Sequence, residues 1–200
     1  MRRGPFRRLA VTVTIGVVTA LAVLAAAHVA HAQSGIVKRE AWGARPAVTG
    51  RMQAHTIKGI IIHHTSARQK KGASLASKLR NLQHFSLNPG RVGKRAKPAW
   101  GDVPYHFYIG VSGRTAEGRS LKYAGDTNTG YKTDGWIQIV LEGDFTKEQP
   151  APAQLAALRR LTSELKARYR ITGNRISGHN DHASTNCPGP NLKRHIPSLR

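Results

Sequence analysis

The segment TIKGIIIHHTS, residues 56–66, contains three consecutive isoleucines followed by two histidines. A continuous run of β-branched apolar residues is typical of a buried strand. His63 and His64 stand at the C-terminal end of this predicted strand, where open α/β sheets place their ligand sites. The segment therefore predicts a buried strand with a functional site at its end.

The remainder of the chain alternates between predicted helices and strands. Residues 74–85 carry leucines at helical spacing, and residues 146–169 form a longer predicted helix whose start is marked by two prolines. Residues 103–119 predict two strands joined by a turn, and residues 135–145 predict a further strand. The basic segment 90–102, rich in Gly and Pro, predicts a surface loop. This order indicates an α/β fold with helices packed on a central sheet.

The segment GHNDHASTNCPGPNL, residues 178–192, holds the only cysteine among the 200 residues, Cys187. A single cysteine cannot form an intramolecular disulfide, so it is either a buried inert thiol or a metal-bound thiolate. The polar, turn-rich surroundings favour the thiolate, because such a segment is not a core strand. Together with His63 and His179, Cys187 would supply three ligands and leave a fourth position open, as in catalytic zinc sites.

The first 32 residues have the layout of a secretory signal peptide. An arginine-rich start precedes a long apolar run, which ends in the small-residue sequence AHA at residues 30–32. We expect cleavage after Ala32 and an exported domain, periplasmic or secreted, over residues 33–200. The apolar run is long enough that an uncleaved membrane anchor is the alternative.

The chain is strongly basic, with 32 Lys and Arg against 10 Asp and Glu and a net charge of +22. Such a charge favours polyanionic partners, which for an exported protein are the cell wall and anionic lipid surfaces. A solvated basic surface without a partner is the alternative. Nucleic acid is not expected as a partner, because the aromatic content of 6% is low for a single-strand binder.

Five motifs follow one another along residues 36–192: IVKREAWGARP, IIIHHTS, VPYHFYIG, GRTAEGR and GHNDHASTNCPGPNL. In this order they resemble zinc-dependent N-acetylmuramoyl-L-alanine amidases, in the branch shared by peptidoglycan recognition proteins and phage amidases. The resemblance implies a mixed central β-sheet flanked by helices. It also implies hydrolysis of the amide between N-acetylmuramic acid and L-alanine, in peptidoglycan or its muropeptide fragments.

Carried over position by position, the resemblance implies a Zn²⁺ ion bound by His63, His179 and Cys187. Tyr105 matches the residue that the family uses beside the metal-bound water. Thr185 matches a position that helps to stabilise the reacting carbonyl.

The sequence departs from the family in two of its motifs. The run AGDTNTG, residues 124–130, replaces a GAHT-like run, and WIQIVLEG, residues 136–143, replaces a strand that reads SIGI. Val140 stands where some amidases have a catalytic glutamate. Glu142 lies two residues further on, on the same face of a strand, and is a candidate for proton transfer or substrate contact. We also expect His64 to face the substrate or to support a ligand. The alternative is that it only lines the cleft or satisfies a backbone group.

Two other functions fit parts of this pattern. One is a non-catalytic peptidoglycan-binding module, but such relatives characteristically lose the cysteine ligand, which is present here as Cys187. The other is an exported zinc hydrolase that acts on a different amide, because the ligand set alone does not specify the substrate.

Overall fold

The computed structural model describes Met1, residues 35–70 and residues 72–200. Residues Ile36–Arg200 cluster into one unit. The expected signal peptide, residues 1–32, lies outside the described residues except for Met1, so its cleavage stays a prediction. Within the described part of the chain, no helix is long and apolar enough to cross a membrane.

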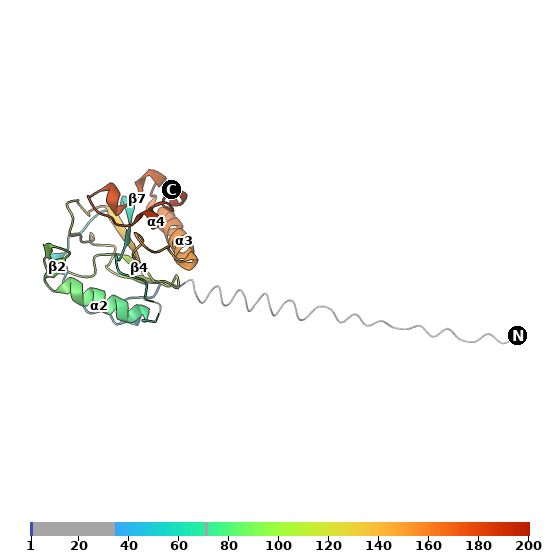
Figure 1. Cartoon of the computed structure of the whole chain (residues 1–200), viewed down its shortest axis with the longest axis horizontal. Coiled ribbons are helices and arrows are strands. Elements are labelled where there is room, and N and C mark those ends of the chain that lie inside the picture. The colour runs from blue at the N-terminus through green and yellow to red at the C-terminus, as the bar shows by residue number, and fades with distance from the viewer. Residues whose placement is uncertain (2–34, 71) are drawn as a thin grey trace. The chain divides into compact units, whose positions relative to one another are not determined.

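The centre of the unit is a five-stranded sheet with the order β5-β4-β6-β1-β7. Figure 1 labels two of these strands, β4 and β7. Its strands are β1 (Gly59–His64), β4 (Phe107–Ile109), β5 (Thr115–Glu117), β6 (Trp136–Leu141) and β7 (Ile176–Gly178). Only β5 runs antiparallel to its neighbour, and the other pairs are parallel. The predicted mixed sheet is therefore confirmed, with one strand, β7, that was not anticipated because it is only three residues long.

Two helices pack on the sheet in separate apolar clusters. Helix α2 (Leu75–Leu87) contributes Leu79 to a cluster with Trp42 and Tyr108, whereas helix α3 (Pro152–Tyr169) contributes Leu158 to the larger core. Short helical segments complete the chain: η1 (Glu40–Trp42), η2 (Thr49–Arg51), η3 (Gly173–Arg175), η4 (His179–Asp181), α4 (Pro190–Lys193) and η5 (Pro197–Leu199).

Helix α3 begins six residues later than the predicted segment 146–169. Ala151 has an extended backbone, with φ −63° and ψ 144°, because the residue before a proline is disfavoured in the helical region. Pro152 then occupies the first turn, where its missing N–H costs nothing.

Alternation along β1 sends its two histidines to opposite faces of the sheet. Ile60 and Ile62 pack in the larger core with α3, and His64 follows them on that face. Ile61 and His63 therefore point to the other face. The two adjacent histidines therefore belong to different faces of the sheet.

The segment 90–102 is more ordered than the predicted surface loop. It contains an antiparallel hairpin of β2 (Gly90–Val92) and β3 (Arg95–Lys97). Lys97 is 1% exposed and donates to the carbonyls of Ser86 and Asn88 at the C-terminal end of α2. The prediction of a loop was wrong because the two strands lack the apolar alternation on which a strand is recognised. The hairpin is instead stabilised by its backbone pairing and by the bonds of Lys97 to the end of α2.

Candidate metal centre

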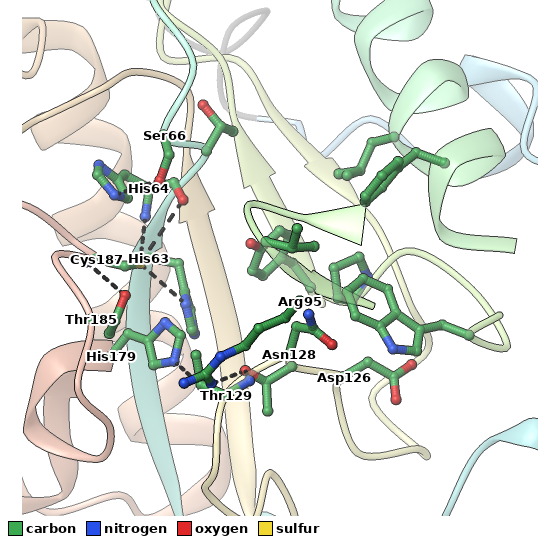
Figure 2. Close-up of a pocket in the computed structure, with 18 of the residues that line it drawn as sticks. His63, His64, Ser66, Arg95, Asp126, Asn128, Thr129, His179, Thr185 and Cys187 are labelled. Atoms are coloured by element: carbon green, nitrogen blue, oxygen red, sulfur yellow. Dashed lines mark hydrogen bonds between the residues drawn. The ribbon is translucent and has the colours of Figure 1, made fainter. Parts of the chain in front are cut away.

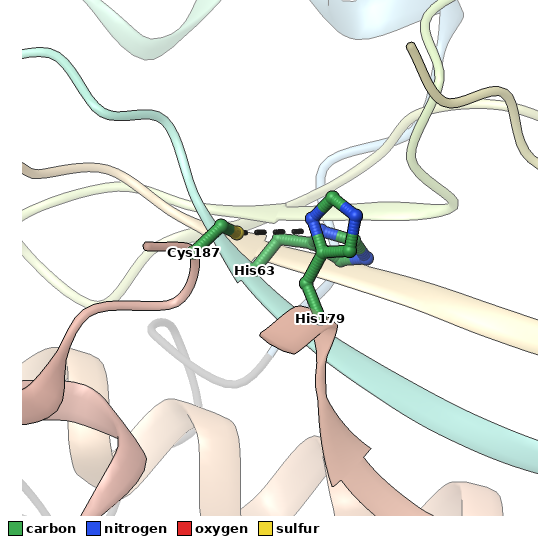
Figure 3. Close-up of side chains that lie close together, drawn as sticks. All are labelled: His63, His179 and Cys187. Carbon is green, nitrogen blue, oxygen red and sulfur yellow. Dashed lines mark hydrogen bonds between the residues drawn. The ribbon is translucent and has the colours of Figure 1, made fainter. Parts of the chain in front are cut away.

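Three buried side chains with metal-binding groups meet at one edge of the sheet (Figure 3). His63 is the second-to-last residue of β1, His179 opens η4 directly after β7, and Cys187 lies in the loop before α4. Because β1 and β7 are parallel neighbours, their C-terminal ends reach the same edge. One ligand atom from each residue lies within 4.8 Å of the other two, so the cluster could hold a metal ion.

The spacing and chemistry of these atoms fit a zinc ion. His63 Nδ1 lies 3.6 Å from Cys187 Sγ. Bond lengths of about 2.3 Å to sulfur and about 2.0–2.1 Å to nitrogen, at a tetrahedral angle, separate two ligand atoms by about 3.6 Å. Imidazole and thiolate are also ligands that zinc accepts more readily than hard cations do.

Burial sets the protonation of all three groups. It lowers the pKa of His63 well below the usual value and the pKa of His179 to about 4, so both rings are neutral at pH 7. Burial also raises the pKa of the Cys187 thiol to about 12, while the backbone N–H of His64 opposes this by donating to Sγ at 3.4 Å. A divalent cation would favour the thiolate much more strongly.

The three ligand candidates form one side of a cleft with a volume of ≈ 570 Å³ (Figure 2). Tyr105 and Thr185 line the same cleft. The β2–β3 hairpin and its surroundings line another part of the cleft, through Phe85, Arg91, Val92, Arg95 and Trp100. The loop residues 126–129 line it as well. The site is thus open to a ligand much larger than a metal ion.

Residues 53–190 match the family model for N-acetylmuramoyl-L-alanine amidase. The chain belongs to this amidase family. Peptidoglycan-recognition protein SC2 of Drosophila simulans is 30% identical over 181 residues, which are 88% of this chain and 94% of the relative. An endolysin of Klebsiella phage KP32 is 37% identical over 99 residues, which are 48% of this chain and 64% of the endolysin. The solved structure of peptidoglycan recognition protein-LE in complex with tracheal cytotoxin, a monomeric diaminopimelic acid-type peptidoglycan, has a TM-score of 0.69 at 26% identity and covers 82% of this chain and 94% of that one.

The matched amidase segment contains Tyr105 and Thr185, and the structure brings both to the cleft. The ring of Tyr105 lies 5.2 Å from the ring of His63, and burial raises its pKa, so the phenol is a hydrogen-bond donor and not a ready base. Thr185 Oγ1 accepts the N–H of Cys187 at 3.2 Å. That contact leaves the hydroxyl proton of Thr185 for a group in the cleft.

His64 is one of the residues that line the cleft, and its ring also contacts the protein on both sides. Its Nδ1 accepts the N–H of Phe145 at 3.1 Å, so its Nε2 donates to Ser66 Oγ at 2.8 Å. Both ring nitrogens are therefore engaged within the protein. The bond from Phe145 fits the alternative expectation that His64 satisfies a backbone group, and the backbone N–H of His64 donates to Cys187.

Glu142 does not line the cleft. It is 3% exposed, forms an ion pair with Lys78 at 2.8 Å and accepts the N–H of Lys70 at 2.9 Å. Glu142 shares a strand face with Val140, as expected. Its carboxylate is paired with Lys78 of α2 and so does not reach the cleft. These contacts tie α2 to the end of β6.

Two polar residues that the sequence analysis did not single out contact the ligand histidines. Gln138 Oε1 lies 2.5 Å from His63 Nε2, and Thr129 Oγ1 lies 2.7 Å from His179 Nε2. The available signals were a glutamine inside the apolar run of β6 and a threonine in the altered run 124–130. Neither signal indicates a partner without the three-dimensional arrangement.

Proposed function

We propose that this chain is an exported, zinc-dependent N-acetylmuramoyl-L-alanine amidase. The observation that carries the proposal is the buried set of His63, His179 and Cys187 at the wall of an open cleft. The family match over residues 53–190 supports the reaction type. The endolysin relative and the structural neighbour in complex with a monomeric peptidoglycan support cell-wall fragments or polymer as the substrate.

The zinc would be held by the two histidines and the cysteine. When bound, zinc lowers the pKa of a water molecule to about 7 and polarises a carbonyl group. The reaction adds water to the lactyl amide carbon, breaks the bond to the alanine nitrogen and returns a proton to the leaving amine.

Two residues of the cleft would act on the reacting atoms. The protonated phenol of Tyr105 would orient the attacking water or the carbonyl oxygen through a hydrogen bond. The hydroxyl of Thr185 would donate to the same oxygen as negative charge develops on it. One such donor is typically worth about 10²–10³ in rate.

The second candidate function is peptidoglycan binding without cleavage. The observation that favours it is the name of a relative: peptidoglycan-recognition protein SC2, whose match covers 88% of this chain. The intact ligand set argues for the enzyme, since binding alone needs no open metal position.

Mass analysis of cell wall treated with the purified zinc-loaded protein distinguishes the two functions. The amidase releases stem peptides with a free alanine N-terminus and leaves the glycan chains intact. Wall binding without released peptides would show a recognition module, and cuts at other amides would show a different hydrolase. N-terminal sequencing of exported material should give a start at Gln33, whereas Met1 in a membrane fraction would indicate an anchor.

A further inference from the structure

Both ligand histidines are contacted at the ring nitrogen Nε2. In His63, Nε2 meets Gln138 Oε1, while Nδ1 faces Cys187 Sγ at 3.6 Å. An amide oxygen can only accept a hydrogen bond, so Nε2 of His63 must carry the proton. The lone pair is then on Nδ1, directed toward the sulfur and toward the place of the metal.

Gln138 is held so that its oxygen, not its nitrogen, faces the histidine. It is 1% exposed on β6, beside β1 in the sheet. Tyr131 also donates to Oε1, at 3.2 Å, whereas the amide nitrogen has no partner among the described residues. Burying an amide nitrogen without a partner is unfavourable, so packing alone does not explain a glutamine here.

Thr129 provides the equivalent contact for His179. Its Oγ1 lies 2.7 Å from His179 Nε2 and 2.7 Å from Thr127 Oγ1. Thr127 Oγ1 already accepts the backbone N–H of Thr129 at 3.2 Å, which anchors the hydroxyl pair. Thr129 can therefore accept from His179 and donate to Thr127.

From these contacts we infer that Gln138 and Thr129 are positioning residues of the metal centre. Each accepts the Nε2–H of one ligand histidine, so that both rings present Nδ1 to a single point shared with Cys187. The inference rests on the proposed zinc site. Thr129 lies in the segment 124–130 and Gln138 lies in the segment 136–143, the two segments that differ from the motifs of the resemblance.

Metal affinity tests the inference without relying on activity. The Gln138→Leu and Thr129→Val variants keep the size of each side chain and remove the acceptor. Competition with a chromogenic chelator should show zinc binding weakened about 10–100-fold in each, the usual cost of losing the partner of a metal ligand. In Co²⁺-loaded protein, the visible bands should shift as well, because they report the ligand geometry.

Conservative variants and a variant far from the site distinguish the loss of a positioning contact from a general loss of folding. Gln138→Glu and Thr129→Ser keep an acceptor oxygen and should retain near wild-type affinity. Thr162→Val is the matched control, because Thr162 is a buried threonine of α3 whose hydroxyl has no partner among the described residues. It should leave zinc affinity unchanged.

The outcomes are distinct. If Gln138→Leu fails to fold, Thr129→Val decides, because Thr129 lies in a half-buried loop outside the sheet. Zinc affinity within twofold of wild type in the folded Leu and Val variants would overturn the inference and leave the zinc site standing. A wild-type protein that binds no zinc would instead overturn the proposed metal centre, and the inference with it.

Discussion

The two sides of the cleft are built in opposite ways. On the metal side, His63, His179 and Cys187 are 3%, 7% and 8% exposed and project from strand ends or the adjoining turns. On the hairpin side, Arg91 and Arg95 are exposed on two three-residue strands. The metal side is built at the ends of strands of the central sheet, whereas the other side rests on a separate two-stranded hairpin.

The hairpin is nevertheless attached at a defined point. The ammonium group of Lys97 lies 4.9 Å from the ring of Phe85 and 4.4 Å from the ring of Trp100, in addition to its bonds to carbonyls. Such cation–π contacts are strongest when the charge is removed from water. Under the proposed function, the metal side would perform the chemistry, and the exposed arginines of the hairpin side would contact anionic ligands.

The largest effect should follow from removing a ligand on the metal side. Cys187→Ser should lose most of its zinc and reduce peptide release by more than the ~100-fold that is typical for the partner of a metal ligand. A thiolate offsets the charge of zinc, and a neutral hydroxyl does not. Elemental analysis and the wall-release assay measure the two losses. Unchanged zinc content would remove Cys187 from the ligand set.

Tyr105→Phe should reduce kcat about 10²–10³-fold and leave KM and zinc content nearly unchanged, because it deletes only a hydroxyl that acts in the transition state. Tyr108→Phe is the matched control, since Tyr108 is a buried tyrosine that packs under α2 and does not line the cleft. Equal losses of kcat in both variants would show that Tyr105 has a packing role.

Glu142→Gln tests whether the metal side needs a carboxylate. Because Glu142 is paired with Lys78 outside the cleft, we expect unchanged kcat and a loss of stability of about 1–3 kcal/mol, the cost of leaving a buried charged partner poorly satisfied. Denaturant unfolding measures the stability. If kcat collapses while stability is unchanged, Glu142 takes part in the reaction, and the structural role given to it by its ion pair with Lys78 is wrong.

The sequence predicted the metal side of the cleft better than the hairpin side. Strong apolar patterns predicted the strand 56–66 and the helix 74–85; β1 lies within the first segment, and α2 overlaps the second. The lone cysteine pointed to the candidate metal ligands. The hairpin was missed because its strands are short and charged, so only tertiary contacts hold them. Lys97 was not foreseen as a buried residue, because lysine is ordinarily exposed.

Within the site, alternation predicted that Glu142 shares a face with Val140, but not that Lys78 would reach it from another element. The contacts of Gln138 and Thr129 depend on segments far apart in the sequence, such as β1 and β6. Local patterns identify which residues have useful chemistry. They do not identify which of those residues meet.

The smallest effect should come from the hairpin side, where Arg95 is drawn pointing from the hairpin into the cleft (Figure 2). Arg95→Ala should raise KM for anionic muropeptides about 1.4- to fivefold, because exposed charge pairs contribute about 0.2–1 kcal/mol each. It should leave kcat and zinc content unchanged. Arg160→Ala on the exposed surface of α3 is the matched control and should leave KM unchanged. The difference between the two variants should shrink as salt is raised from 0.05 to ~0.5 M, since salt screens exposed charges. A KM for Arg95→Ala that equals the wild-type value at low salt would show that the hairpin does not contact the substrate, and the division of the cleft into a chemical and a selective side would fail.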